Sequence, residues 1–238
     1  MTQYNEWRSL VDLQVYNDIP DSAVYRLKLN DVGGTIEDSI GDLSPTNNGV
    51  TSVSGDYQGG SAGEGDGSSA YINLNSPLPD VGWSSDFAVA FTIDNWSASD
   101  VRQNVIGLLD GSARARIEGG DTENEDVLTL RLRDDNENTA RIESASVLGD
   151  CAKYRVVFNR VGNDASNWEV FVNAVDDTGP STGSLNTGLT FSNDFHLFAR
   201  NNSGAQNFLP GILDDAILYG DSLTDSGVQA DYDNQPWT

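Results

Sequence analysis

Histidine, cysteine and methionine are almost missing from this sequence, with one residue of each among 238. The single cysteine, Cys151, excludes a disulfide within the chain, and its place at the start of a strand pattern predicts a buried, inert thiol. The single histidine, His196, stands between Phe195 and Leu197, which predicts a structural role. One histidine cannot build a histidine-rich zinc site, and no Gly-x-Ser-x-Gly nucleophile motif accompanies it. These absences argue against zinc hydrolases and Ser-His-Asp enzymes.

Long apolar runs are missing as well. No stretch approaches the roughly 20 apolar residues that a membrane-spanning helix requires. The opening residues, MTQYNEWRSL, lack the basic and apolar regions of a secretory signal peptide. We therefore expect synthesis in a cytoplasm, no export by the usual route and no insertion into a membrane.

Basic residues are scarce, with 13 Lys and Arg against 37 Asp and Glu, and only Lys28 and Lys153 are lysines. The net charge of −24 argues against nucleic acid and anionic membranes as partners, because both require a basic surface. The acids are spread along the whole chain. This spread favours adaptation to high salt, where screening makes a dense carboxylate surface tolerable, over dedicated sites for divalent cations.

The sequence does contain many short strand patterns, separated by turns rich in Gly, Asn, Asp and Ser. Within them apolar residues recur at every second position, which is the period of a β-strand. Many short strands with regular turns predict an antiparallel sandwich or barrel. The expected strands cover residues 24–29, 70–74, 87–93, 104–109, 113–118, 127–132, 139–147, 153–159, 168–172, 195–200 and 211–219.

Two helical patterns flank the strands. Residues 4–16 carry apolar side chains at helical spacing, and this helical pattern ends before Pro20. We expect residues 1–22 to form a helical segment, either packed on the domain or docking it onto a larger assembly, and residues 23–238 to form the sandwich. The segment TDSGVQADYDN predicts a short C-terminal helix with Thr224 as its N-cap.

The glycine-rich run GDYQGGSAGEGDGSS, residues 55–69, is similar to a phosphate-binding loop only in composition. It lacks the Gly-Lys-Ser/Thr ending, it contains acids, and no helix pattern follows it. We predict a loop or turn.

Paired carboxylates are the catalytic chemistry that the composition leaves open. Glycosidases need two of them roughly 5–10 Å apart. Glu123 and Glu125, two residues apart, come nearest in the sequence to a pair of carboxylates on one strand, so a glycoside hydrolase is one hypothesis.

Calcium prefers carboxylate and carbonyl oxygens on turns. Asp38 and Asp42 in IEDSIGD and Asp214 in ILDDAIL are candidate ligands, and a solvated acidic surface is the alternative interpretation. Sugar rings stack on exposed aromatic side chains. Tyr57, Trp83 and Trp96 lie in or beside predicted turns and are candidate glycan contacts, with core or edge packing as the alternative. Trp168 lies in a strand pattern and is predicted to be core.

Four segments, in order, resemble the concanavalin A-like and laminin G-like lectin domains. They are YRLKLNDVGGTIEDSIGD, then SSAYINL with FAVAFTI, then GDCAKYRVVFNRVGNDASNWEVFVNA, and finally FHLFARNNSGAQNFLPGILDDAILYGDSLTDSGVQADY. The resemblance covers residues 23–233 and implies a two-sheet jelly-roll sandwich. It also implies non-catalytic binding of glycans or proteins, and a calcium ion near Asp38 and Asp214. The Glu-x-Asp-x-x-Glu strand of the family's glucanases is absent.

An acidic laminin G-like domain behind a short helix is also similar to structural proteins of viruses that infect halophilic archaea. This resemblance implies a location on the virion surface, contacts with other virion proteins through residues 1–22, homo-oligomerisation and attachment to host surface glycan or glycoprotein. A purely structural decoration that stabilises the capsid, with no glycan site, is the second hypothesis.

Overall fold

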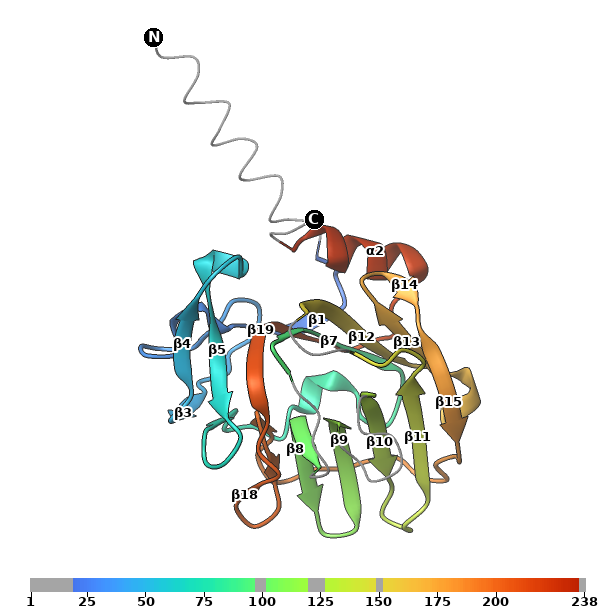
Figure 1. Cartoon of the computed structure of the whole chain (residues 1–238). Coiled ribbons are helices and arrows are strands. Elements are labelled where there is room, and N and C mark those ends of the chain that lie inside the picture. The colour runs from blue at the N-terminus through green and yellow to red at the C-terminus, as the bar shows by residue number, and fades with distance from the viewer. Residues whose placement is uncertain (1–18, 97–101, 120–126, 149–151, 236–238) are drawn as a thin grey trace.

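The computed structural model describes residues 19–96, 102–119, 127–148 and 152–235. In these residues two β-sheets pack face to face, and helix α2 (Asp225–Asp233) lies across the outside of the first sheet (Figure 1). The predicted all-β, antiparallel, jelly-roll-like sandwich is confirmed, as is the C-terminal helix. The predicted helix over residues 4–16 lies outside the described residues. No described helix has the length and hydropathy that crossing a membrane requires.

The first sheet has the strand order β14-β13-β12-β7-β19-β1-β2, and β5 pairs with both β19 and β4. Its strands are β1 Ala23–Lys28, β2 Glu37–Asp38, β4 Thr51–Ser54, β5 Ser61–Asp66, β7 Phe87–Asp94, β12 Tyr154–Arg160, β13 Glu169–Val172, β14 Val175–Asp176 and β19 Pro210–Tyr219.

The second sheet has the order β15-β11-β10-β9-β8-β16-β6-β3, with β17 beside β8 and β18 beside β17. Its strands are β3 Thr46–Asn48, β6 Tyr71–Asn73, β8 Gln103–Asp110, β9 Ala113–Gly119, β10 Thr129–Arg133, β11 Thr139–Ser144, β15 Thr178–Thr182, β16 His196–Leu197, β17 Arg200–Asn201 and β18 Ala205–Gln206. Short 3-10 turns occur at Leu29–Asp31, Gln58–Gly60, Pro79–Val81 and Ala165–Asn167.

The core fills the space between the sheets because alternate residues of each strand point inward. In β7, Phe87 and Phe91 face the main core, whereas Ala88 and Ala90 face the layer under α2. Both faces of this central strand are therefore covered. Trp168 is 1% exposed and belongs to the main core, as predicted.

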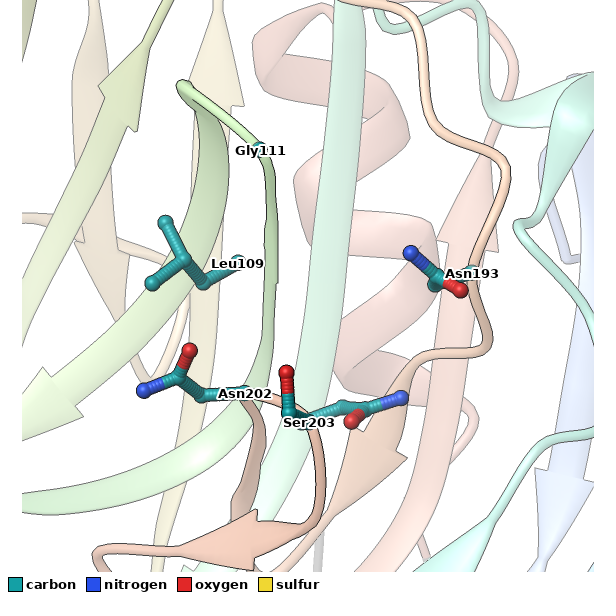
Figure 2. A pocket seen from close by; sticks show the side chains of 6 residues that line it. Leu109, Gly111, Asn193, Asn202 and Ser203 are labelled. Atoms are coloured by element: carbon teal, nitrogen blue, oxygen red, sulfur yellow. The ribbon is translucent and has the colours of Figure 1, made fainter.

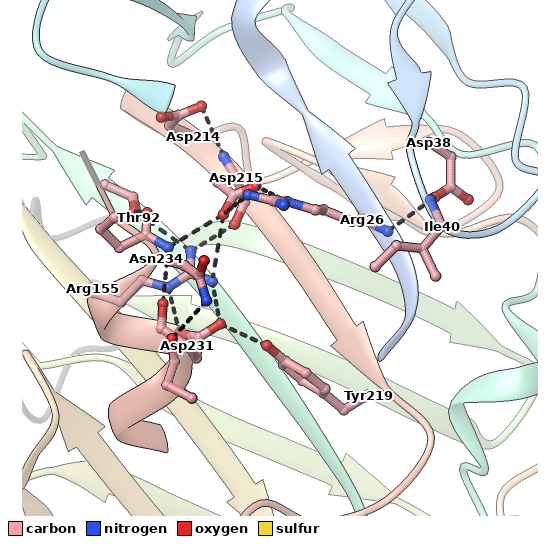
Figure 3. Close-up of polar contacts among 12 residues, drawn as sticks. Arg26, Asp38, Ile40, Thr92, Arg155, Asp214, Asp215, Tyr219, Asp231 and Asn234 are labelled. Carbon is pink, nitrogen blue, oxygen red and sulfur yellow. Dashed lines mark hydrogen bonds and ion pairs between the residues drawn. The ribbon is translucent and has the colours of Figure 1, made fainter. Parts of the chain in front are cut away.

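A β-bulge in β19 places two aspartates on the outer face of the first sheet. The pairing of β19 with β7 shifts between Asp214 and Ile217, and Asp215 adopts a left-handed backbone with φ of 44°. A bulge re-aims side chains at the extra residue. It here turns the carboxylate of Asp215 towards Arg26, whose Nε donates to it at 2.6 Å (Figure 3).

Helix α2 is fixed to the sheet by a second buried ion pair. Arg155 donates two hydrogen bonds of 2.7 Å to the carboxylate of Asp231, and its Nη1 donates to the carbonyl of Asp215 at 2.6 Å. The phenol of Tyr219 also donates to Asp231, at 2.6 Å. The helix begins at the predicted N-cap, where the Oγ1 of Thr224 accepts the N–H of Gly227 at 3.2 Å.

The glycine-rich run does not form a loop throughout, which corrects the prediction. Residues 61–66 form β5, which pairs with β4 and β19. A Cβ at Gly65 would lie 2.7 Å from the ring of Phe198, and one at Gly63 would lie 3.1 Å from Val50. The strand needs glycine because neighbouring side chains occupy the space that its own side chains would take.

The segment FHLFAR, predicted as one strand, forms β16 and β17 with a break between them. Phe198 adopts a left-handed backbone with φ of 62°, and its N–H donates to the carbonyl of Val105 at 2.8 Å. The break brings Arg200 and Asn201 alongside β8.

Candidate functional site

The three candidate glycan contacts, Tyr57, Trp83 and Trp96, lie inside the protein, in agreement with the alternative interpretation of core or edge packing. Trp83 is 7% exposed and stacks on Phe195, with ring centroids 4.8 Å apart, and it contacts the edges of Phe87 and Phe191. The indole is part of the main core instead of facing solvent.

Tyr57 and Trp96 are held by polar partners. The phenol of Tyr57, 8% exposed, donates to Asp94 at 2.8 Å, and Lys153 lies 4.1 Å above its ring. Burial and the nearby carboxylates raise the pKa of Tyr57 well above its usual range. Trp96, 3% exposed, donates from Nε1 to Gln103 at 2.6 Å. None of the three offers a sugar an open ring face.

The candidate calcium ligands Asp38, Asp42 and Asp214 do not assemble into a cation site. Within the described part of the chain, no three His, Cys, Asp or Glu side chains are grouped so that they could hold a metal ion. The carboxylate of Asp38 instead accepts the N–H groups of Arg26, Ile40, Gly41 and Leu43, at 2.9–3.2 Å. Asp214 is buried on the bulge of β19. Calcium binding stays a prediction from the sequence.

His196 has a structural setting. It is 5% exposed, and its ring lies 4.6 Å from that of Tyr71. Burial lowers the pKa of His196 to about 4, and Asp194 opposes this shift. The folded protein therefore holds a neutral imidazole over most of the pH range. Glu123, Glu125 and Cys151 lie outside the described residues.

A pH dependence of stability follows from His196. The unfolded chain binds the proton at about pH 6.5, whereas the folded protein binds it only near pH 4. Stability is therefore lost as pH falls from about 6.5 to 4, because the proton favours the unfolded state. Urea unfolding across this window should show a smaller loss for His196→Gln than for the native chain. Parallel curves for the two proteins would contradict the assignment.

The second sheet carries rows of arginines on the face turned away from the core. In β9, Ala113, Ala115 and Ile117 point inward, so Arg114 and Arg116 point outward. The same alternation places more arginines on the outer face of the next two strands. We call the following set the arginine face: Arg114 and Arg116 on β9, Arg131 and Arg133 on β10, Arg141 on β11, and Arg200 on the adjoining β17.

The strand register brings these arginines together. Arg131 pairs directly with Arg116 on one side and Arg141 on the other, and Arg133 pairs with Arg114. Directly opposed like charges destabilise a sheet. The direct pairing of arginines therefore lowers the stability of this sheet, and the packing of the core does not require arginine at these outward positions.

Glu118 offsets part of this charge from the end of β9. Its carboxylate, fully buried, lies 2.8 Å from Nε of Arg116, 3.0 Å from Arg102 and 3.5 Å from Arg131. Burial lowers the pKa of Arg116 to about 9, and the charges of neighbouring arginines act in the same direction. The carboxylate of Glu118 acts in the opposite direction. The guanidinium still carries its charge at neutral pH.

A polar pocket of about 300 Å³ borders the arginine face. Figure 2 shows Asn193 on one side of it and Leu109 and Asn202 on the other. We call it the amide pocket, and its lining consists of Leu109, Gly111, Asn193, Asn201, Asn202 and Ser203.

Asp110, at the end of β8, anchors the wall residue Asn193 of the amide pocket. Its carboxylate accepts hydrogen bonds from Ser192 and from both the backbone and the Nδ2 of Asn193, at 2.6–3.1 Å. Although burial raises the pKa of Asp110, these hydrogen bonds lower it below its usual value. The Oδ1 atoms of Asn193 and Asn202 accept no hydrogen bond from the described residues, so they are available to hydroxyl donors.

The amide pocket and the arginine face are continuous. Leu109, in the pocket wall, pairs with Arg114 across the β8–β9 ladder. Arg200 directly precedes Asn201, another wall residue. Gly107 leaves room for the side chains of Arg116 and Arg200, because a Cβ at this position would lie 3.2 Å from each of them. Amide and hydroxyl groups that bind sugar hydroxyls thus stand beside guanidinium groups that bind oxyanions.

The sequence-based search for site residues missed both features. The sequence does contain one signal for the arginine face. Arginine recurs at alternate positions of ARARIE and TLRLR and occurs again in TARIE, although the chain has very few basic residues. The amide pocket has no comparable signal, because its walls come from β8 and from residues more than 80 positions later in the sequence.

No protein-family model matches the sequence, and no curated protein matches it. Solved structures do match the fold. The binding domain of Paraclostridial Mosquitocidal Protein 1 aligns with a TM-score of 0.69 and 15% identity, over 89% of this chain and 52% of that one. The botulinum neurotoxin serotype G binding domain aligns with a TM-score of 0.66 and 14% identity, over 88% of this chain and 50% of that one.

The binding domain of botulinum neurotoxin DC, solved in complex with SialylT, aligns at 0.67 and 13% identity, over 91% of this chain and 52% of that chain. The chain thus spans about half the length of these solved chains. At such identities the likeness concerns the fold alone. The protein has the jelly-roll-like β-sandwich fold that also occurs in these toxin binding domains.

Proposed function

We propose that this protein is a non-catalytic carbohydrate-binding domain and that the amide pocket is where a sugar binds. The observation that supports this most directly is the pocket itself, whose open carbonyl oxygens are matched to hydroxyl donors. The similar solved structures are themselves called binding domains, and one was solved with SialylT. Their fold supports a binding role rather than catalysis.

The chemistry of the pocket suits a sugar better than an apolar ligand. Leu109 supplies one apolar surface for the C–H face of a ring, and Asn193, Asn202 and Ser203 surround it with polar groups. Carbohydrates need this mixture, because each ring presents both C–H groups and hydroxyls. The backbone anchors at Asp110 hold the wall in place before the ligand arrives, which lowers the entropic cost of binding.

Glycan-array binding of the whole chain, at high salt, tests the proposal. We expect selective binding, weakened about three- to tenfold by Asn202→Ala, since one hydrogen bond contributes about 0.5–1.5 kcal/mol. Asn167→Ala, an exposed asparagine on the β12–β13 turn, is the matched control and should bind as the native chain does. No binding above that of denatured protein would refute the proposal.

We also propose that the carbohydrate is on a host surface and that this domain is displayed on a virion. The support is the resemblance in sequence to structural proteins of viruses of halophilic archaea, together with the acidity of the chain. Attachment through residues 1–22 and homo-oligomerisation belong to the same proposal. Antibody labelling of purified particles tests it, and particles that lack the protein would exclude it.

A further inference from the structure

The arginine face is unusual for the protein that carries it. The chain has only 13 basic residues and a net charge of −24. Five of those basic residues lie on the neighbouring strands β9, β10 and β11, where several oppose one another directly in the ladder, and Arg200 lies on β17, beyond β8. Like-charge pairs of this kind cost stability. A compensating anion would remove the cost.

Carboxylates lie on this face, yet one buried arginine, Arg116, keeps N–H groups without acceptors in the described part of the chain. Glu118 contacts Arg116 and Arg131, and Glu143 lies 3.6 Å from Arg141. Arg116 is 1% exposed, and its Nη1 and Nη2 atoms have no hydrogen-bond partner among the described residues. Buried N–H groups without acceptors are costly, and an absent ion is a common explanation for them.

The edge of the arginine face nearest the amide pocket is formed by Arg114, Arg133 and Arg200. Arg114 pairs with Arg133 on β10 and, on its other side, with Leu109 of the pocket wall, and Arg200 packs against Gly107 two residues before Leu109. Burial lowers the pKa of Arg114 to about 10, and the charges of Arg133 and Arg200 contribute to this lowering. Arg133 is anchored by donation from Nε to the carbonyl of Ser112 at 2.7 Å, and Arg200 by donation to Gln206 at 3.2 Å. Each anchor leaves further N–H groups on the same guanidinium.

We propose that the ligand is an anionic polysaccharide whose carboxylate or sulfate group binds to Arg114, Arg133 and Arg200 while a neighbouring sugar occupies the amide pocket. This inference rests on the proposed carbohydrate-binding function and names the class of carbohydrate. Guanidinium groups bind planar and tetrahedral oxyanions through paired hydrogen bonds, which are among the stronger polar contacts. The continuity of face and pocket allows one chain to reach both.

The net charge of the protein sets the conditions under which this works. At low salt, the acidic surface repels a polyanion over a long range. At 1 M salt the Debye length falls to about 3 Å, so this repulsion is screened while contacts at hydrogen-bond distance persist. We therefore expect binding of a polyanion to remain measurable in high salt, where purely long-range attraction would be lost.

Dextran sulfate, polygalacturonate and uncharged dextran, tested by biolayer interferometry with the whole chain at 1 M NaCl, distinguish the possibilities. We expect both polyanions to bind at least about tenfold more tightly than dextran, and the tighter of the two identifies sulfate or carboxylate as the preferred group. Arg114→Gln/Arg200→Gln should weaken polyanion binding by about ten- to a hundredfold, because hydrogen bonds to charged groups contribute about 1.5–3 kcal/mol. Arg114→Lys/Arg200→Lys, which keeps the charge but loses the paired geometry, should fall between.

The matched control is Lys28→Gln/Lys153→Gln, which makes the same change in net charge away from the arginine face and should bind as the native chain does. Equal binding of all three polymers, with loss only in Asn202→Ala, would overturn the anionic ligand and leave the carbohydrate proposal intact. Binding of no polymer and no glycan would refute both. Melting temperatures of all variants identify any that fail to fold, and the lysine variant then carries the test.

Discussion

Replacing Asp231 by asparagine is expected to lower the free energy of unfolding by about 3–5 kcal/mol, the usual cost of breaking a buried ion pair from one side. The carboxylate of Asp231 is fully buried and accepts three hydrogen bonds, two from Arg155 and one from Tyr219. Burial alone lowers the pKa of Arg155, but Asp231 raises it above its usual value. Without that carboxylate, the charge of Arg155 remains in the interior with Asp215 as its nearest counter-ion, at 3.9 Å.

Urea unfolding followed by tryptophan fluorescence measures this effect. Asp233→Asn, on the exposed side of the same helix, makes the same change in charge and should alter stability by no more than about 0.5 kcal/mol. The double variant Arg155→Met/Asp231→Leu should recover much of the loss, because it removes both charges together. Equal effects of Asp231→Asn and Asp233→Asn would show that the buried pair does not fix the helix.

Replacing Trp83 by alanine is expected to cost about 3–5 kcal/mol, the range for large-to-small aromatic substitutions in a core. Trp83 is in contact with three phenylalanine rings, and its Nε1 donates to the carbonyl of Pro77 at 3.3 Å. Its removal leaves a cavity among Phe87, Phe191 and Phe195 that these rings cannot fill without leaving their own contacts.

This substitution also separates a core role from a sugar-stacking role. Trp83→Phe keeps most of the apolar volume and should lose markedly less stability than Trp83→Ala in the same unfolding assay. An exposed stacking residue would give the opposite pattern, with little change in stability and a loss of glycan binding. A Trp83→Ala chain as stable as the native one would contradict its placement in the core.

Much of the fold could be predicted because its signals are local. The period-two pattern of FAVAFTI follows from a strand with each face packed against a different layer, and Thr224 caps its helix through a contact three residues away. The glycine-rich strand β5 could not be predicted. Its glycines are required by Phe198 and Val50, which are distant in the sequence, and local propensity favours a turn there.

The candidate site divides in the same way. The alternation in ARARIE and TLRLR determines by itself that arginines share one face of each strand, since side chains in a strand point alternately to opposite sides. Only the tertiary structure decided that these strands lie side by side in register, so that Arg116, Arg131 and Arg141 form one row. Burial of Tyr57, Trp83 and Trp96 was likewise a tertiary outcome, because a turn residue becomes core only when another part of the chain covers it. The sequence determined the sandwich, its acidity and its few basic residues, whereas long-range packing decided where those basic residues gather and which pocket they border.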